Sequence, residues 1–120
     1  MDGKHICIRK PARSGSLFFN YKRYFSTVLL AVCDFRYRFV YVDIGSYGTQ
    51  ADGGIFNSSA LKQLLNNGQL DLPNPSNLPG SNLRTPSYFV ADAAFNLSPN
   101  VMKPFGGSNL AINKRVYNYR

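Results

Sequence analysis

The sequence predicts a mixed α/β domain in which helices pack on a β-sheet. Residues 25–33 form a near-continuous apolar run with β-branched content, which is typical of a central strand buried on both faces. Residues 55–67 instead repeat apolar side chains at helical spacing. The length of 120 residues fits one domain, so we assign residues 1–120 to a single unit.

The N-terminal half is predicted to be mostly strand. Residues 5–9 form a short strand with alternating faces. The apolar run 25–33 and the strand 39–44 are joined by a polar turn at residues 34–38, which predicts an antiparallel hairpin. Residues 45–54 contain four glycines and no apolar run, so we expect a loop there.

The C-terminal half alternates helix and strand. The predicted helix 55–67 ends before Gly68. Residues 71–87 contain four prolines and are predicted to be an exposed, irregular connection. A strand follows at residues 88–93, and residues 109–120 form the beginning of a further helix. The order strand, strand pair, helix, strand, helix predicts a mixed sheet with flanking helices.

Charge and cysteine content narrow the class of protein. The formal charge of +8 favours polyanionic partners, although a merely soluble basic surface explains it equally well. No apolar run reaches the ~18 residues that a membrane helix needs, and no secretory leader pattern is seen. We therefore expect an intracellular protein whose two distant cysteines, Cys7 and Cys33, are reduced thiols.

All six acidic residues are aspartates, and three of them are candidate metal ligands: Asp2, Asp52 and Asp92. Carboxylate oxygens are the ligands that Mg²⁺ and Mn²⁺ prefer. If the strands that carry Asp2 and Asp92 are neighbours, their side chains meet at one edge of the sheet. A few acidic side chains can bind a metal ion, and the many basic side chains can bind phosphate groups. This combination indicates catalysis on nucleic acid.

Each of these aspartates has a structural alternative. Asp2 is equally well a disordered terminal residue. Asp92 is equally well part of a turn or cap at the end of its strand. Asp52 precedes two glycines and a helix, so capping of that helix is the favoured local explanation. Capping and metal binding do not exclude each other, because a carboxylate has two oxygens.

The other acids are predicted to be structural. Asp34 lies in the hairpin turn, and Asp71 lies beside the proline-rich connection. Asp43 falls within a strand, where we favour pairing with a nearby arginine. His5 lies close to Asp2 in sequence, so it is a candidate accessory residue as a ligand, proton carrier or phosphate contact, although a packed and hydrogen-bonded histidine is commoner.

Basic and aromatic residues alternate through the segment between the first strand and the hairpin. Such a stretch can hold a phosphate backbone while aromatic faces meet bases, or it can be a solvated edge whose aromatics belong to the core. The candidate nucleic-acid contacts are Lys4, Arg9, Lys10, Arg13, Lys22 and Arg23.

Several short motifs follow one another along nearly the whole chain: Asp2-Gly3-Lys4-His5, Asn20-Tyr21-Lys22, Asp52-Gly53-Gly54-Ile55-Phe56, Pro79-Gly80, Val90-Ala91-Asp92-Ala93-Ala94-Phe95, Met102-Lys103-Pro104-Phe105 and Arg115-Val116-Tyr117-Asn118-Tyr119-Arg120. Together and in this order they resemble the DDE-type endonuclease domain of Harbinger-like transposases and the nucleases derived from them.

This resemblance implies a ribonuclease H-like fold and nuclear, divalent-metal-dependent cleavage of DNA by in-line displacement, with no membrane and no small-molecule substrate. It implies that Asp2 and Asp92 lie on adjoining strands and that Asp52 belongs to the catalytic and metal-binding group. A separate DNA-binding accessory protein is a further expected partner.

The chain also departs from the family. Family members carry a glutamate on their last helix, and this chain contains no glutamate. The family's upstream DNA-binding region is also missing, so we expect an incomplete domain. Two alternatives to an active nuclease therefore stay open: a non-catalytic DNA- or protein-binding remnant, and a fragment with an open sheet edge that does not fold stably.

Overall fold

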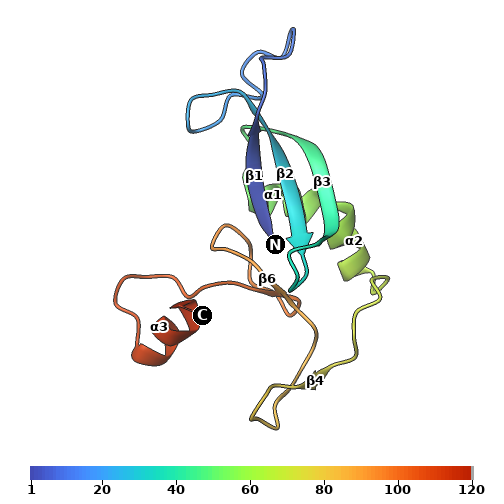
Figure 1. Ribbon diagram of the computed structural model, residues 1–120, viewed down its shortest axis with the longest axis vertical. Coiled ribbons are helices and arrows are strands. Elements are labelled where there is room, and N and C mark those ends of the chain that lie inside the picture. Colours follow the sequence, from blue (N-terminus) through green and yellow to red (C-terminus); the bar gives the residue numbers. More distant parts are fainter. Residues whose placement is uncertain (120) are drawn as a thin grey trace.

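A computed structural model describes residues 1–119, and its main element is a three-stranded antiparallel sheet (Figure 1). The strands β1 (Asp2–Cys7), β2 (Ser26–Cys33) and β3 (Phe39–Tyr47) pair in the order β1-β2-β3. The predicted hairpin of β2 and β3 is confirmed. In β2 every second residue is buried and the residues between are half-buried or exposed, so this central strand is buried on one face only, not on both as expected.

The first strand begins earlier than the sequence indicated. Asp2 pairs with Ala31, and the pairing continues to Cys7 opposite Ser26. Disorder at Asp2 is therefore the wrong alternative. Strand β3 also runs three residues further than predicted, to Tyr47, and its register against β2 shifts twice, between Val28 and Leu29 and between Val32 and Cys33 of β2.

The predicted helix 55–67 is two helices, α1 (Asp52–Ser58) and α2 (Ala60–Asn66). Ser59 separates them, because its backbone is extended, with φ −73° and ψ 154°. Its side chain accepts a hydrogen bond from the amide of Lys62 at 3.2 Å, which caps α2. The predicted stop is confirmed: Gly68 follows with a φ of 64°, in the left-handed region that glycine adopts easily.

The remaining chain forms short elements. The irregular connection holds only a small antiparallel pair, β4 (Ser76–Asn77) and β5 (Arg84–Thr85). Strand β6 (Phe89–Val90) is shorter than predicted and pairs in parallel with β7 (Val101–Met102). These pairs are separate from the main sheet, so the prediction of a single mixed sheet is wrong. The predicted α/β class is confirmed. Helix α3 (Ile112–Tyr119) closes the described chain, and Arg120 lies outside the described residues.

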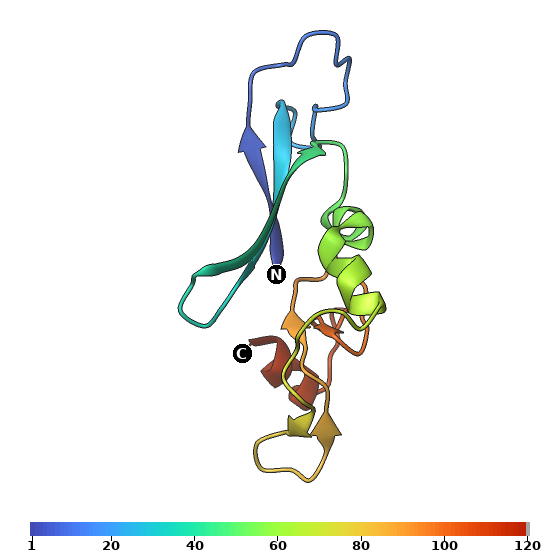
Figure 2. The same ribbon diagram turned by 90° about the vertical axis from the view of Figure 1, so that its right-hand side faces the viewer.

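One hydrophobic core joins the sheet, the helices α1 and α2 and the segment after β6. In Figure 2, α1 and α2 lie on one side of the sheet. The buried face of β2 contributes Leu30, and α1 contributes Ile55 and Phe56. Phe95 is fully buried and contacts Phe56 edge-on, with ring centroids 5.9 Å apart. This contact fixes the chain just after β6 against α1.

The molecule is elongated, because the C-terminal half of the chain extends beyond one end of the sheet (Figure 2). Its radius of gyration is 16.9 Å, against about 14 Å for a compact domain of this length. On the face of the sheet away from α1, Ile44 is 61% exposed. Cys7 and Cys33 are free thiols, and both are exposed. Among the described helices, none has the length and apolar character required to cross a membrane.

Candidate metal centre

The start of β1 lies beside the end of β6. The nitrogen of Met1 donates a hydrogen bond to the carbonyl oxygen of Val90, at 2.6 Å. This contact brings Asp2 next to Asp92, two residues beyond Val90, although their strands belong to different sheets. The expected meeting of these two carboxylates is therefore found, but a single hydrogen bond between the segments replaces the predicted ladder of adjoining strands.

Asp52 is the first residue of α1, and Ala51 takes the cap position with an extended backbone. No side chain caps this helix by a hydrogen bond, so the capping role favoured for Asp52 is wrong. A carboxylate in the first turn still interacts favourably with the positive end of the helix dipole. Its two oxygens are free to face the strand β1.

Asp92 combines a structural role with its place in the cluster. One carboxylate oxygen accepts a hydrogen bond from the amide of Ala94 at 2.9 Å, which forms a tight turn. Buried Ala91 and Phe95 on either side anchor this turn in the core. The turn alternative for Asp92 is therefore correct, and the second oxygen remains available.

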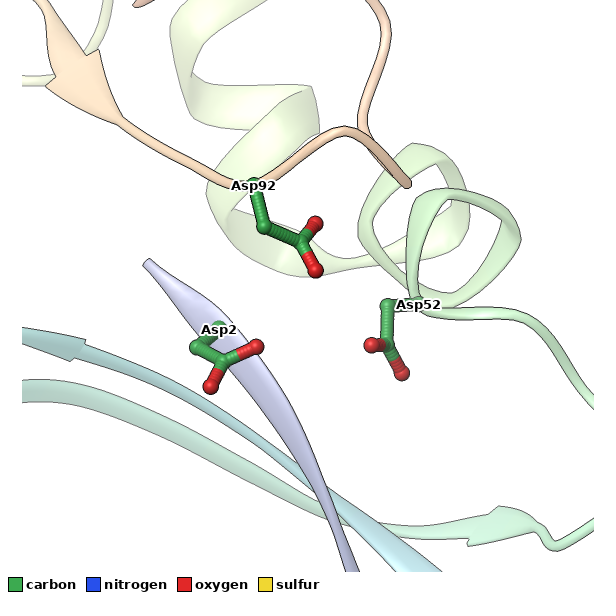
Figure 3. A group of neighbouring side chains, drawn as sticks. All are labelled: Asp2, Asp52 and Asp92. Carbon is green, nitrogen blue, oxygen red and sulfur yellow. The ribbon is translucent and has the colours of Figure 1, made fainter. Parts of the chain in front are cut away.

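The carboxylates of Asp2, Asp52 and Asp92 converge. One oxygen from each lies within 4.8 Å of the others. Figure 3 shows the three side chains directed toward a common space, one from the start of β1, one from the start of α1 and one from the turn after β6. Three carboxylate oxygens at this spacing fit a hard divalent cation, which takes oxygen ligands and keeps water at its open positions.

The cluster is electrostatically unfavourable without a cation. Partial burial raises the pKa of the Asp52 carboxyl above its ordinary value of 3.8, and the charges of Asp2 and Asp92 raise this pKa further. A charged His5 acts in the opposite direction. Like charges held together in this way are stabilised by a bound cation.

Two glycines make room for Asp52 and its helix. A Cβ atom at Gly3 would collide with the carboxylate of Asp52, and one at Gly53 would collide with the carbonyl oxygen of Ala94. The absence of these two side chains therefore lets α1 approach both β1 and the turn that carries Asp92. Any larger residue at position 3 would displace the Asp52 carboxylate.

The cluster lies in a hollow of about 660 Å³ that also contains basic and aromatic groups. Lys4, His5, Tyr21 and Lys22 line it, and both lysines are exposed. The His5 ring contacts Tyr21 edge-on at 5.7 Å between centroids. Lysine ammonium groups beside carboxylates can hold a phosphate group next to a metal ion that the carboxylates bind.

The other predicted nucleic-acid contacts do not line this hollow. Arg9, Lys10, Arg13 and Arg23 are all exposed, but they lie in the long loop between β1 and β2. In Figures 1 and 2 that loop extends beyond the end of β1 opposite to the N-terminus. The predicted basic set is therefore divided: Lys4 and Lys22 line the hollow, and the other four lie in exposed parts of the loop outside it.

The remaining aspartates lie outside the cluster. Asp34 orders the hairpin turn as expected: it accepts hydrogen bonds from the amides of Arg36 and Arg38 and pairs with the Arg38 guanidinium at 2.7 Å. These contacts with Arg38 lower the pKa of the Asp34 carboxyl. The arginine pairing favoured for Asp43 is wrong within the described chain, since its carboxylate accepts instead from the Tyr41 hydroxyl, at 3.4 Å.

A comparison with protein families identifies the chain. The family model described as "DDE superfamily endonuclease" matches residues 1–120. The chain belongs to this family. No curated protein and no solved structure gave a significant match to this DDE superfamily endonuclease domain.

The sequence interpretation of this DDE superfamily endonuclease domain assigned no role to three residues that shape the site. Gly3 makes room for the Asp52 carboxylate. Asn20 and Ser26 are buried polar residues: the Ser26 hydroxyl is hydrogen-bonded to Nδ1 of His5, and the Asn20 side chain donates to Ser26. A glycine next to Asp2 and a polar residue at the start of the apolar run were the available signals, but only the fold shows what they contact.

Proposed function

We propose that this chain is a divalent-metal-dependent DNA endonuclease domain of Harbinger-like transposase origin. The observation that carries the proposal is the convergence of Asp2, Asp52 and Asp92 within 4.8 Å. Membership of the DDE superfamily endonuclease family supports it. The order of the family's motifs along the whole chain supports the Harbinger-like lineage, a ribonuclease H-like arrangement of the strands and a nuclear location.

The donor set fits Mg²⁺ or Mn²⁺. All three donors are carboxylates, which hard cations prefer, and the space that Gly3 leaves open is filled by the Asp52 carboxylate. When bound, one divalent ion would activate water and a second would neutralise charge on the leaving oxygen of a phosphodiester. We assign the role of holding these ions to the three aspartates.

The basic residues would act on the DNA backbone. Lys4 and Lys22 are in the hollow, where they would neutralise the phosphate nearest the carboxylates. Arg9, Lys10, Arg13 and Arg23 would bind phosphates outside the hollow. Such contacts position a duplex without reading its sequence, so we propose that a separate DNA-binding accessory protein selects the target.

A second candidate is a non-catalytic DNA-binding domain derived from such a nuclease. The absence of glutamate from these 120 residues favours it, because the cluster then has only aspartates to offer. The formal charge of +8 supports DNA binding in either case. The two candidates differ in whether a bound cation leads to cleavage.

Calorimetric titration with Mn²⁺ tests the metal site. We expect the wild-type chain to bind Mn²⁺ and Asp2→Asn and Asp52→Asn to lose most of that affinity. The matched control is Asp71→Asn, which changes an exposed aspartate outside the cluster and should bind like the wild type. Equal Mn²⁺ affinity in all four proteins would reject the cluster as the metal site.

A plasmid-nicking assay separates the two candidate functions. The endonuclease proposal expects Mg²⁺- or Mn²⁺-dependent nicking of supercoiled DNA by the wild type, abolished in Asp92→Asn. The second candidate expects metal-independent retention of DNA with no nicking in any variant.

A further inference from the structure

A buried chain of hydrogen bonds behind His5 determines which of its ring nitrogens carries the proton. The chain runs from the backbone of the β1–β2 loop through Asn20 and Ser26 to His5. Asn20 is 3% exposed and Ser26 is fully buried. Each donor in this chain can be assigned in turn, starting from backbone amides, whose role as donors is certain.

The amide orientation of Asn20 follows first. Its oxygen accepts hydrogen bonds from the backbone nitrogens of Lys22, at 2.9 Å, and Tyr24, at 3.3 Å. The other side-chain atom of Asn20 is therefore the nitrogen, which donates to the hydroxyl oxygen of Ser26 at 2.8 Å.

The hydroxyl of Ser26 then has one proton to donate. Its described side-chain partners are Asn20, which is already the donor, and Nδ1 of His5 at 2.8 Å. A buried hydroxyl that does not donate costs free energy, so Ser26 donates to Nδ1. A nitrogen that accepts this bond is unprotonated, and the neutral His5 ring therefore carries its proton on Nε2.

The ring lies beside the metal centre. Gly3 and His5 are two residues apart on β1 and so lie on one face of the strand, and the Asp52 carboxylate covers Gly3 on that face. His5 lines the same hollow as the three aspartates but is not one of the converging ligands. In the part of the chain that the structure describes, no acceptor is paired with Nε2.

We infer that His5 is a substrate-binding residue whose Nε2–H donates to a phosphate oxygen of DNA beside the metal centre, and that Ser26 and Asn20 position it. The inference rests on the proposed function for its substrate. It excludes two other roles for the neutral ring, because a protonated Nε2 can neither ligate a cation nor accept a proton.

Nitrogen NMR of the imidazole ring tests the tautomer directly, since His5 is the only histidine in the chain. The spectrum is recorded without metal at about pH 8, where an ordinary imidazole is neutral. We expect a protonated Nε2 and an unprotonated Nδ1. Ser26→Ala should give a mixture of both tautomers. A wild-type ring protonated at Nδ1 overturns the inference, whatever the protein binds.

Binding of a short duplex DNA, measured by fluorescence anisotropy, tests the contact. His5→Leu should weaken binding roughly ten-fold, as expected for one lost hydrogen bond to a charged acceptor. His5→Gln should recover most of this affinity, because its amide nitrogen can replace Nε2 as a donor. Both variants should leave the salt dependence unchanged, since no charge is lost.

Mn²⁺ titration and thermal unfolding of the same variants distinguish a failure of this inference from a failure of the proposed function. His5→Leu should bind Mn²⁺ like the wild type, and a large loss of Mn²⁺ affinity in a folded His5→Leu would make His5 a ligand and reject the inference. A wild type that binds neither Mn²⁺ nor DNA would instead reject the proposed function. Equal DNA affinity of His5→Leu and wild type would reject the phosphate contact alone.

Discussion

Gly3 lies directly against the carboxylate of Asp52, so closely that a Cβ atom at position 3 would overlap it. The two residues are far apart in sequence, one in β1 and the other at the start of α1. Their contact shows that the position of the central carboxylate in the cluster depends on a missing side chain. The space at Gly3 is therefore part of the candidate metal centre.

Gly3→Ala should weaken Mn²⁺ binding without unfolding the domain. The added methyl group pushes the Asp52 side chain away, and the backbone of Gly3 is not in the left-handed region, so alanine fits it. We expect a loss of about ten-fold or more in affinity by calorimetry, as for groups that orient a ligand. The control Gly54→Ala adds a methyl group to open space in α1 and should bind normally. Normal binding by Gly3→Ala would show that the site tolerates displacement of Asp52.

Asp52→Asn should stabilise the metal-free protein at neutral pH. Burial and the neighbouring carboxylates raise the pKa of Asp52 in the folded state, so its ionisation disfavours folding. Stability from this group is fully present below its ordinary pKa of 3.8 and is lost as the pH rises through the raised pKa. The gain in unfolding temperature from Asp52→Asn should therefore vanish in acid. Excess Mn²⁺ should reverse the order of stability, because the wild type binds the ion much more tightly than the variant. A variant less stable than the wild type at neutral pH without metal would contradict this account.

Phe95→Ala should destabilise the fold and disturb the metal site together. Phe95 is fully buried against Phe56 and holds the turn that carries Asp92. Loss of a buried phenylalanine costs about 3–5 kcal/mol of unfolding free energy, which urea denaturation can measure. The matched control Leu97→Ala removes a side chain that is 67% exposed and should change little. Similar unfolding midpoints for the two variants would place Phe95 outside the core.

Lys22→Gln should reduce both the affinity for duplex DNA and its salt dependence. Lys22 is exposed and lines the hollow with the aspartates. Each neutralised phosphate contributes roughly 0.9 to the slope of log affinity against log salt, so the variant should lose about that amount. Tyr21→Phe, in the same hollow, removes no charge and should keep the slope. An unchanged slope in Lys22→Gln would remove this lysine from the DNA contact.

Local patterns predicted the elements whose signals lie in adjacent residues. The apolar run 25–33, the turn at Asp34 and the stop at Gly68 were all found. The helix 55–67 was predicted as continuous because its apolar spacing is unbroken, but Ser59 adopts an extended backbone and starts a second helix. A serine within a helical run was the available signal for this break.

The predictions of a single mixed sheet and of helix capping by Asp52 were wrong for a different reason. Strand pairing between distant segments depends on tertiary contacts, and here Met1 meets Val90 through one hydrogen bond rather than through a continuous ladder. The cap position fell one residue earlier, on Ala51, which left the Asp52 carboxylate facing β1 instead of its own helix. No local pattern distinguishes these two positions.

The amino-acid sequence by itself determined the composition of the site: only aspartates as acids, a large excess of bases, and motifs in the order of an endonuclease family. The tertiary structure alone decided that the carboxylates of Asp2, Asp52 and Asp92 come within 4.8 Å, with Gly3 making the space and Ser26 orienting His5. The physical reason is that residue type fixes which groups can bind a cation or a phosphate, whereas their distance depends on packing between segments far apart in the chain.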